Sequence, residues 1–158
     1  MSKALLLLGL LLFSGCTSSQ LSPARELEGT WQTPFPVTFF IKTDFINMEL
    51  EDVGSEDRMM TWIITKGSND NTVDVEVSFT TSNRTLTPGS GYTPDIPLMS
   101  LVGTISGTEL TLSTSNGRVI GTFSFTTDLM MGTWVDSWEL AYAQEVYTKT
   151  NELKLERQ

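Results

Sequence analysis

The stretch Val73-Asp74-Val75-Glu76-Val77-Ser78-Phe79-Thr80 decides the fold class. Its odd positions are apolar and its even positions are polar or charged. Successive side chains of a β-strand point to opposite faces, so this alternation predicts a strand with one face toward a core and the other toward water. The segment from Ile46 to Glu51 alternates in the same way and predicts a second strand of this kind.

Further runs have the β-branched, aromatic and threonine content that is typical of strands. They are residues 36–43, 59–66, 98–106, 108–114, 118–126, 129–135 and 146–155. Together these runs predict about nine strands. Only residues 137–144 have a helical composition, and they would form about two turns. The chain is therefore predicted to be all-β.

The connections between these runs are short and rich in turn-forming residues. Residues 66–71, 106–108 and 115–117 carry Gly, Asn, Asp and Ser, and the pair Asn116-Gly117 suits a type I′ hairpin. Successive hairpins predict an antiparallel up-and-down meander. Such a sheet hides its inner face by closing on itself or by stacking as a sandwich, and the hairpins favour closure. A barrel of eight or nine strands either fills with side chains or holds one small ligand.

A four-residue pattern recurs on four of the predicted strands: any residue, then Gly, Thr and an apolar residue. It occurs as Glu28-Gly29-Thr30-Trp31, Val102-Gly103-Thr104-Ile105, Ile120-Gly121-Thr122-Phe123 and Met131-Gly132-Thr133-Trp134. Glycine inside a strand marks a bend or the close approach of another group, which a tightly curved barrel needs repeatedly. A chance match among threonine-rich strands is the alternative explanation.

These residues resemble the calycin group of small barrels, the lipocalins and avidin-like proteins, whose first strand opens with Gly-X-Trp. Gly29-Thr30-Trp31 matches that motif at the start of the domain, and Gly132-Thr133-Trp134 repeats it in a late strand. Thr127-Asp128 is similar to a second lipocalin motif. The resemblance, over residues 27–155, implies a structural role for Gly29, Trp31, Gly132 and Trp134. It also implies a basic residue over the first tryptophan, for which Lys154 and Arg157 are the candidates.

The first residues have the features of a secretory signal. Lys3 gives a positive start, residues 4–13 form an apolar run, and Ser14-Gly15 are small residues before a cleavage site. The run is shorter than the roughly 20 residues that a helix needs to cross a bilayer. Residues 1–15 are therefore predicted to be a cleaved signal peptide.

Residues Leu12-Phe13-Ser14-Gly15-Cys16 resemble the lipobox of bacterial lipoproteins. The resemblance implies that Cys16 becomes the new N-terminus and carries acyl chains such as palmitate, which together anchor a protein firmly to a membrane. Thr17, which is not aspartate, implies export to the outer membrane, with the domain facing the periplasm. The alternative is that Cys16 is a small apolar residue of a signal that is cut elsewhere.

The residues after Cys16 are small, polar and interrupted by Pro23, a composition typical of a flexible tether. Residues 16–26 are predicted to be the acylated cysteine and its tether, and residues 27–158 the lipocalin-like β-barrel domain.

Composition excludes several classes of function. The 158 residues include no histidine and one cysteine, so a serine or cysteine triad, a histidine-containing zinc site and an internal disulfide are excluded. The formal net charge of −9 repels nucleic acid and anionic lipid headgroups, so no nucleic-acid partner is expected. No cofactor motif is present, and an enzyme is not expected.

Polar clusters offer few candidates for chemistry. Asp52, Glu56 and Asp57 crowd one predicted hairpin, where paired carboxylates are usually solvated rather than catalytic. The segment Asn69-Asp70-Asn71 with Asp74 is rich in oxygen ligands, but its spacing fits turn residues better than an EF-hand calcium loop. Residues 81–97 form a long predicted loop, a length typical of lids, binding loops or disorder.

Aromatic residues supply the candidate ligand contacts. Trp62, Tyr92 and Trp138 are predicted to line a barrel mouth, whereas Trp31 and Trp134 are predicted to fill the barrel end. Two hypotheses remain open. One is an outer-membrane-anchored binding module for a small apolar ligand or an envelope protein. The other is an interaction protein with a filled core, such as a hydrolase inhibitor, a role that calycin-like barrels also have.

Overall fold

The computed structural model describes residues 21–44, 49–90, 92, 98–140 and 144–158, and only the backbone of residues 137–140, 144–147 and 151. Nine strands make up almost all of this part of the chain. They are β1 (Gly29–Gln32), β2 (Val37–Thr43), β3 (Glu51–Lys66), β4 (Thr72–Leu86), β5 (Met99–Ser106), β6 (Glu109–Ser113), β7 (Val119–Phe125), β8 (Leu129–Leu140) and β9 (Gln144–Arg157). The predicted all-β class is confirmed.

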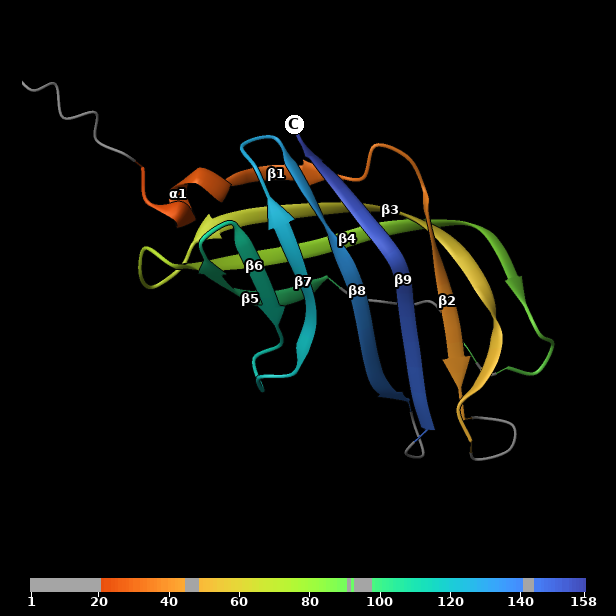
Figure 1. Ribbon diagram of the computed structural model, residues 1–158. Helices are drawn as coiled ribbons and strands as arrows, with labels where there is room; N and C mark the ends of the chain where they lie inside the picture. The colour runs from red at the N-terminus through yellow and green to blue at the C-terminus, as the bar shows by residue number, and fades with distance from the viewer. Residues whose placement is uncertain (1–20, 45–48, 91, 93–97, 141–143) are drawn as a thin grey trace, which may run out of the picture.

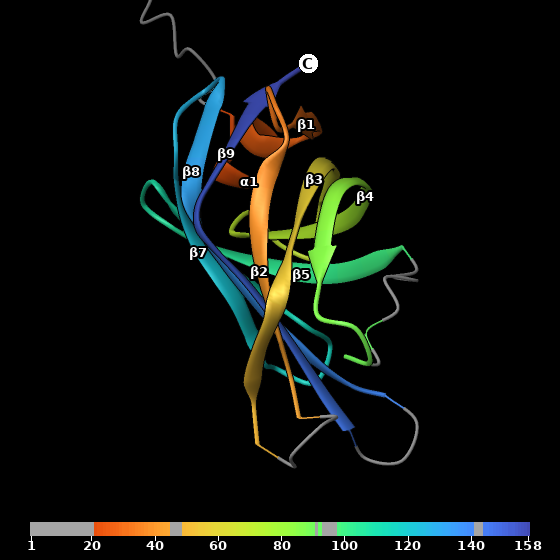
Figure 2. The ribbon, with the colours of Figure 1, turned by 90° about the vertical axis from the view of Figure 1, so that its right-hand side faces the viewer.

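The sheet closes into an antiparallel barrel (Figures 1 and 2). Each strand from β2 to β9 pairs with the next strand along the chain, and β9 returns to β2. Strands β1 and β2 both lie between β3 and β9, so nine strands fill eight positions around the barrel. The predicted up-and-down meander closed into a small barrel is confirmed.

One short helix, α1 (Pro23–Leu27), precedes the first strand. Its Ala24 and Leu27 are fully buried, and the Ala24 amide donates to the Asp70 carbonyl oxygen at 3.1 Å. The predicted tether, residues 16–26, therefore overlaps a helix that packs on the barrel. Among the described residues there is no helix with the length and apolar composition that crossing a membrane requires.

The helix predicted over residues 137–144 is wrong. Residues 137–140 belong to β8 and Gln144 to β9, and residues 141–143 lie outside the described residues. Ser137 pairs with Tyr147 and Leu140 pairs with Gln144 in a continuous antiparallel ladder. Pairing with a neighbouring strand overrides local helical composition in this hairpin.

Two other local predictions differ from the structure. Asn116 does not adopt positive φ, whereas Gly117 does, at 85°. The Thr114 amide donates to the Arg118 carbonyl oxygen, so the loop has three residues rather than a two-residue type I′ turn. The predicted strand over residues 46–51 also fails at Leu50, which lies outside any strand and is exposed, while residues 46–48 lie outside the described residues.

The barrel has two parts. In the first, which we call the closed end, β1 takes the place of β2 between β3 and β9, β5–β7 are present, and α1 packs on β3 and β4 (Figure 1). Strand β4 pairs with β5 only over residues 72–77, and β7 pairs with β8 only up to Trp134. Beyond these points β2, β3, β4, β8 and β9 continue without β5–β7. We call this second part, residues 37–43, 51–58, 78–86, 135–140 and 144–150, the extended end.

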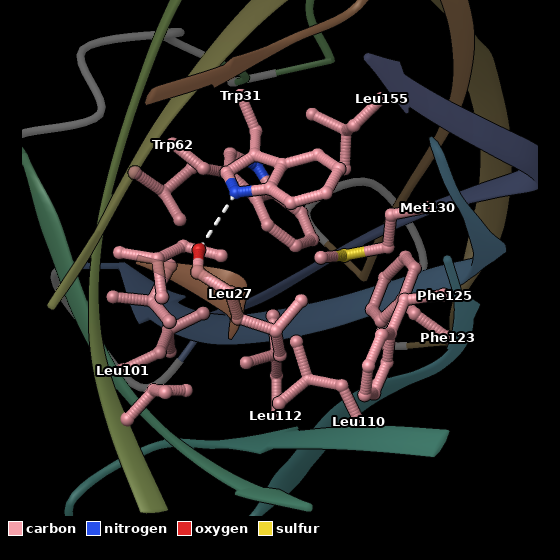
Figure 3. Close-up of a cluster of buried hydrophobic side chains, with 14 of the residues drawn as sticks. Leu27, Trp31, Trp62, Leu101, Leu110, Leu112, Phe123, Phe125, Met130 and Leu155 are labelled. Carbon is pink, nitrogen blue, oxygen red and sulfur yellow. Dashed lines mark hydrogen bonds between the residues drawn. The ribbon is translucent and has the colours of Figure 1, made fainter. Parts of the chain in front are cut away.

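An apolar core fills the closed end (Figure 3). Val73, Val75 and Val77 of β4 belong to the same buried cluster as Phe123 and Phe125 of β7. The inward faces of these two strands thus share one packed interior.

The Gly-Thr recurrence has a packing reason. A Cβ atom on Gly132 would lie 2.2 Å from the Thr122 carbonyl oxygen and 2.6 Å from the Phe123 ring. A Cβ atom on Gly121 would likewise lie 2.8 Å from that ring. These two glycines make room for the side chain of Phe123 in the core.

Candidate functional site

Trp31 seals the closed end. Its side chain is fully buried, and its indole Nε1 donates to the Leu27 carbonyl oxygen at 2.9 Å (Figure 3). This bond ties the first strand to α1. The position fits the predicted role of Trp31 as a side chain that fills the barrel end.

Arg157 covers Trp31 from outside the core. Its guanidinium carbon lies 4.7 Å from the centre of the Trp31 ring system. The same guanidinium donates from Nη1 to the Glu28 carbonyl oxygen at 2.7 Å, from Nε to the Thr127 carbonyl oxygen at 2.8 Å, and from Nη2 to the Glu26 carbonyl oxygen. Of the two basic candidates in the sequence, Arg157 is therefore the one that packs over the first tryptophan.

The three motifs that resemble calycins therefore meet at one place. Gly29 has φ of 136°, and a Cβ atom built there would lie 3.5 Å from Arg157 Nη1. The Arg157 amide donates to the Asp128 carbonyl oxygen at 3.1 Å. The first motif, the Thr127-Asp128 turn and Arg157 close the barrel end together.

Trp62 and Trp134 lie in the packed core rather than at an opening. Both are buried, and their ring centroids are 5.8 Å apart. Phe123 meets Trp62 edge-on at 5.0 Å. The Gly132-Thr133-Trp134 motif thus has the structural position that the resemblance implied, and Trp62, a candidate ligand contact, is a core side chain in this structure.

The extended end holds a buried polar cluster, which we call the Arg58 cluster: Glu56, Arg58, Arg84 and Tyr92. Arg58 Nε donates to Glu56 Oε1 at 2.8 Å, and Arg84 Nε donates to Glu56 Oε2 at 3.0 Å. The Tyr92 hydroxyl donates to Glu56 Oε1 at 3.0 Å and accepts from Arg58 Nη2 at 3.1 Å. Glu56 and Arg58 are 0% and 1% exposed.

Two aromatic rings hold the Arg58 guanidinium in place. Its central carbon lies 4.4 Å from the ring centroid of Phe39 on β2 and 4.4 Å from that of Phe79 on β4. Contacts of this kind are favourable because the face of an aromatic ring is electronegative. The Arg58 guanidinium is therefore held by the Phe39 and Phe79 rings as well as by its hydrogen bonds.

Tyr92 also belongs to a small apolar cluster beside the Arg58 cluster. Its side chain packs with Ile41, Val53 and Leu86 and is 6% exposed. Burial raises the pKa of Tyr92 to about 12, with the neighbouring Arg58 charge opposing that shift and Glu56 reinforcing it. The phenol is thus neutral at physiological pH.

A second partly buried ion pair involves Asp136 on β8, which belongs to the extended end. Arg118 Nη2 donates to Asp136 Oδ1 at 2.6 Å, and the Asp136 side chain is 3% exposed. Thr43, Thr148 and Thr150 are also buried there. The interior of the extended end thus mixes buried polar groups with apolar side chains, whereas the core of the closed end is apolar.

The prediction that Glu56 is a solvated turn residue is wrong. Glu56 lies within β3 and is fully buried, whereas Asp52 is exposed and Asp57 bonds to Thr38 and Asn83 at the surface. These two hydrogen bonds, Asn83 first, hold the pKa of Asp57 below its usual value. One signal in the sequence points to Glu56: Met60, Trp62 and Ile64 face inward at a period of two. Continuing that period backward places Arg58 and Glu56 on the same face.

The predicted loop over residues 81–97 is wrong in its first part. Residues 81–86 belong to β4, which continues past the bulge at Asn83, where φ is 46°. Thr87 and Ser90 form a turn, and the Thr43 hydroxyl donates to the Ser90 carbonyl oxygen at 3.2 Å. Residues 91 and 93–97 lie outside the described residues.

The remaining candidates lie elsewhere. Asn69, Asp70 and Asn71 form the turn between β3 and β4, where Asp70 pairs with Lys66 at 2.6 Å. Within the part of the chain that the structure describes, no three His, Cys, Asp or Glu side chains gather as metal ligands would. Trp138 lies on β8 opposite Val146, and its side chain is outside the description, as is Cys16.

The Arg58 cluster is the candidate site. It combines a guanidinium held between two aromatic rings, a second arginine that is partly accessible, and a buried tyrosine packed among apolar side chains. Comparison with family models, with curated proteins and with solved structures finds no match, so the fold and this cluster have to be interpreted from their own geometry.

Proposed function

We propose that this chain is a non-catalytic binding module of the cell envelope. Acyl chains on Cys16 hold it at the outer membrane, facing the periplasm, and the extended end of the barrel receives a small ligand. The observation that carries this proposal is the Arg58 cluster, a buried charged group at one end of a barrel whose other end is filled.

Burying these charges costs free energy of folding, and a barrel with a purely structural role does not need such buried charges. Taking Glu56 and Arg58 out of water costs several kcal/mol for each charge before their attraction offsets it, and an apolar pair of similar volume is often as stable. Polar groups fixed at the wall of an otherwise apolar pocket are typical of ligand sites. The ligand that suits this wall has an apolar body and one polar end, which refines the small apolar ligand expected from the sequence.

Calycin-like architecture supports the same function. The barrel closure, and Trp31 held between Leu27 and Arg157, agree with the resemblance in the sequence. A barrel of about eight strands is wide enough to hold one small ligand.

Mass spectrometry of the protein extracted from native membranes tests both parts of the proposal. We expect a mass increase from acylation at Cys16 and a small molecule that is released on denaturation. An unmodified Cys16 would contradict the anchor, and a protein that releases no small molecule would contradict the ligand site.

Cys16→Ser provides the matched variant for the anchor. We expect it to move from the membrane fraction to uncleaved precursor or to the soluble fraction, because serine offers no thiol for acylation. Unchanged detergent partitioning together with an unchanged mass would reject Cys16 as the acylated residue.

A second candidate function is an interaction protein with a filled core, such as a hydrolase inhibitor. The continuous packing of Val73, Val75 and Val77 with Phe123 and Phe125 favours it, because such a core leaves the closed end no room for a ligand. In the same mass spectrometry experiment, this function predicts a co-purifying protein and no small molecule.

A further inference from the structure

A hollow of about 510 Å³ lies on the outer wall of the barrel, at the extended end. We call it the outer groove. Its lining residues come from β2, β3 and β9, which are neighbours in the sheet (Figure 1), and they are Phe40, Lys42, Asp52, Gly54, Ser55 and Lys149. All of them belong to the part of the chain that the structure describes, and none belongs to the Arg58 cluster. The outer groove is therefore separate from the proposed ligand site.

Strand pairing brings an exposed lysine between two apolar side chains at this groove. Phe39 on β2 and Thr148 on β9 are fully buried. Their neighbours Phe40 and Lys149 therefore face outward, because successive side chains of a strand point to opposite faces. Lys149 is the direct partner of Phe40 in one ladder and of Val135 on β8 in the other. Directly opposed side chains of paired strands lie close together, so these three form one row on the outer wall.

The two apolar members of this row are open to solvent. Phe40 is 41% exposed and Val135 is 36% exposed. Neighbouring exposed apolar side chains are more informative than scattered ones, because contiguous apolar patches mark sites of interaction. Aromatic side chains in particular are enriched at the centre of protein interfaces. The row therefore has the apolar part of an interaction surface.

Lys149 supplies a charge that the chain itself does not neutralise. Among the described residues, most lysines and arginines pair with a carboxylate, namely Lys42, Arg58, Lys66, Arg84, Arg118 and Lys154. Within the same residues Lys149 makes no ion pair, although the chain has a formal net charge of −9. An anionic group of a partner therefore complements the groove at Lys149.

The nearby carboxylate does not oppose such a contact. Asp52 already pairs with Lys42 at 3.5 Å, and its side chain is 75% exposed. It lies on β3, two strands away from Lys149 on β9, which is about 10 Å at the usual strand spacing. Charges that are exposed and more than about 8 Å apart are largely screened at physiological ionic strength, and the same screening limits the effect of the net charge.

We propose that the outer groove binds a segment of a partner protein that carries a carboxylate beside an apolar side chain. The carboxylate pairs with Lys149, and the apolar side chain packs on Phe40. Sites for small molecules enclose most of their ligand, whereas this groove is open, so a segment held by the rest of a protein interface suits it better. Such a surface belongs to the second candidate function, an interaction protein, and does not depend on the Arg58 cluster.

Titration of the isotope-labelled full chain with short peptides, followed by NMR, tests the proposal. The probe is acetyl-Gly-Glu-Ser-Leu-Gly-amide, in which Glu and Leu lie on one face of an extended segment. Two matched peptides have Gln in place of Glu, or Ala in place of Leu. We expect millimolar concentrations of the probe to shift the amide signals of Phe40 and Lys149. Each matched peptide should bind about threefold or more weaker, the effect of one exposed ion pair or of part of an apolar contact.

Lys149→Gln removes the charge and keeps the length of the side chain. We expect it to weaken the Glu peptide about threefold and to leave the Gln peptide unchanged. Lys154→Gln is the matched control, because Lys154 also faces outward on β9 but lies at the closed end, where it pairs with Glu156 at 2.7 Å. It should change neither affinity. Equal effects of the two substitutions would overturn the proposal.

Phe40→Ala tests the apolar contact. We expect it to weaken the Glu peptide about fivefold, since the Leu side chain loses its packing surface. Ile63→Ala, which removes an apolar side chain that is 46% exposed on β3, is the control and should have no effect. Circular dichroism checks that both variants fold, and the Lys149→Gln result decides the matter if Phe40→Ala does not.

Sodium acetate serves as the probe for a small anion. Amide shifts with acetate as large as those with the Glu peptide at the same concentration would mean that Lys149 binds an anion only, and would overturn the partner segment. Equal binding of the Glu and Gln peptides, or no shift at the groove, would overturn it as well. None of these results bears on acylation or on the release of a small molecule, so the proposed function stands or fails on its own test.

Discussion

Two buried aromatic residues occupy opposite ends of the barrel and differ in what they bind. Trp31 donates to a backbone carbonyl and packs in the apolar core, under Arg157. Tyr92 donates to the side chain of Glu56 within a charged cluster. Replacing Trp31 therefore removes packing, whereas replacing Tyr92 removes a hydrogen-bonding group from a buried charged cluster. Trp31 is therefore tested by the denaturation midpoint of a variant, and Tyr92 by the pH dependence of stability.

Trp31→Ala should destabilise the whole domain. Truncation of a large buried aromatic side chain costs about 3–5 kcal/mol, a large share of a typical stability of about 5–15 kcal/mol. Denaturation in urea should show a much lower midpoint and an unchanged slope. Trp31→Phe, which keeps an aromatic ring, should have a urea midpoint between those of the wild type and Trp31→Ala. A wild-type midpoint for Trp31→Ala would show that Trp31 does not support the core.

Tyr92 should make stability fall at high pH. Its pKa is about 12 in the folded protein and about 10 in an unfolded chain. Between these values the unfolded chain loses the phenol proton and the folded chain retains it, so the free energy of unfolding falls as pH rises from about 10 to about 12. Urea titrations across this range should show a steeper fall for wild type than for Tyr92→Phe. Parallel curves would contradict the buried, neutral phenol.

At the scale of elements, the β7–β8 ladder shows how single glycines shape the barrel. Phe123 pairs with Gly132, and its ring lies where a Cβ atom on Gly132 or Gly121 would be. The outward neighbour Thr133 is exposed and pairs with Thr122. The glycines are therefore required by the inner face of the ladder and not by its turns.

Gly132→Ala should cost about 1–3 kcal/mol, the range found for overpacked cores, because its Cβ atom would meet a backbone oxygen at 2.2 Å. Thr133→Ala on the exposed face is the control and should change stability by no more than about 0.5 kcal/mol. Thermal or urea unfolding of the two variants measures the difference. Equal effects would mean that the close approach at Gly132 does not constrain the ladder.

For the whole molecule, the topology predicts a spectrum dominated by β-structure. The described residues contain one helix of five residues, α1, and long antiparallel strands. Far-UV circular dichroism of residues 17–158 should therefore show a β-sheet spectrum with little helix. A helix content above about a fifth of the residues would contradict the barrel.

Local patterns in the sequence determined the strand class and most of the strand positions, and they favoured a closed barrel over a sandwich. These patterns act through neighbours in sequence or through one face of a strand. They are the alternation at residues 73–80, the recurring Gly-Thr pattern and the Gly29-Thr30-Trp31 motif. Tertiary structure alone decided that residues 137–140 join a strand, that Arg157 rather than Lys154 covers Trp31, and that Tyr92 reaches Glu56 and Arg58. The first outcome depends on pairing within the β8–β9 hairpin. The other two depend on which segments meet after the barrel closes, and contacts between residues more than thirty positions apart leave no periodic signal in the sequence. The burial of Glu56 lies between the two cases, since the inward period of β3 reaches it but only the surrounding arginines make it stable there.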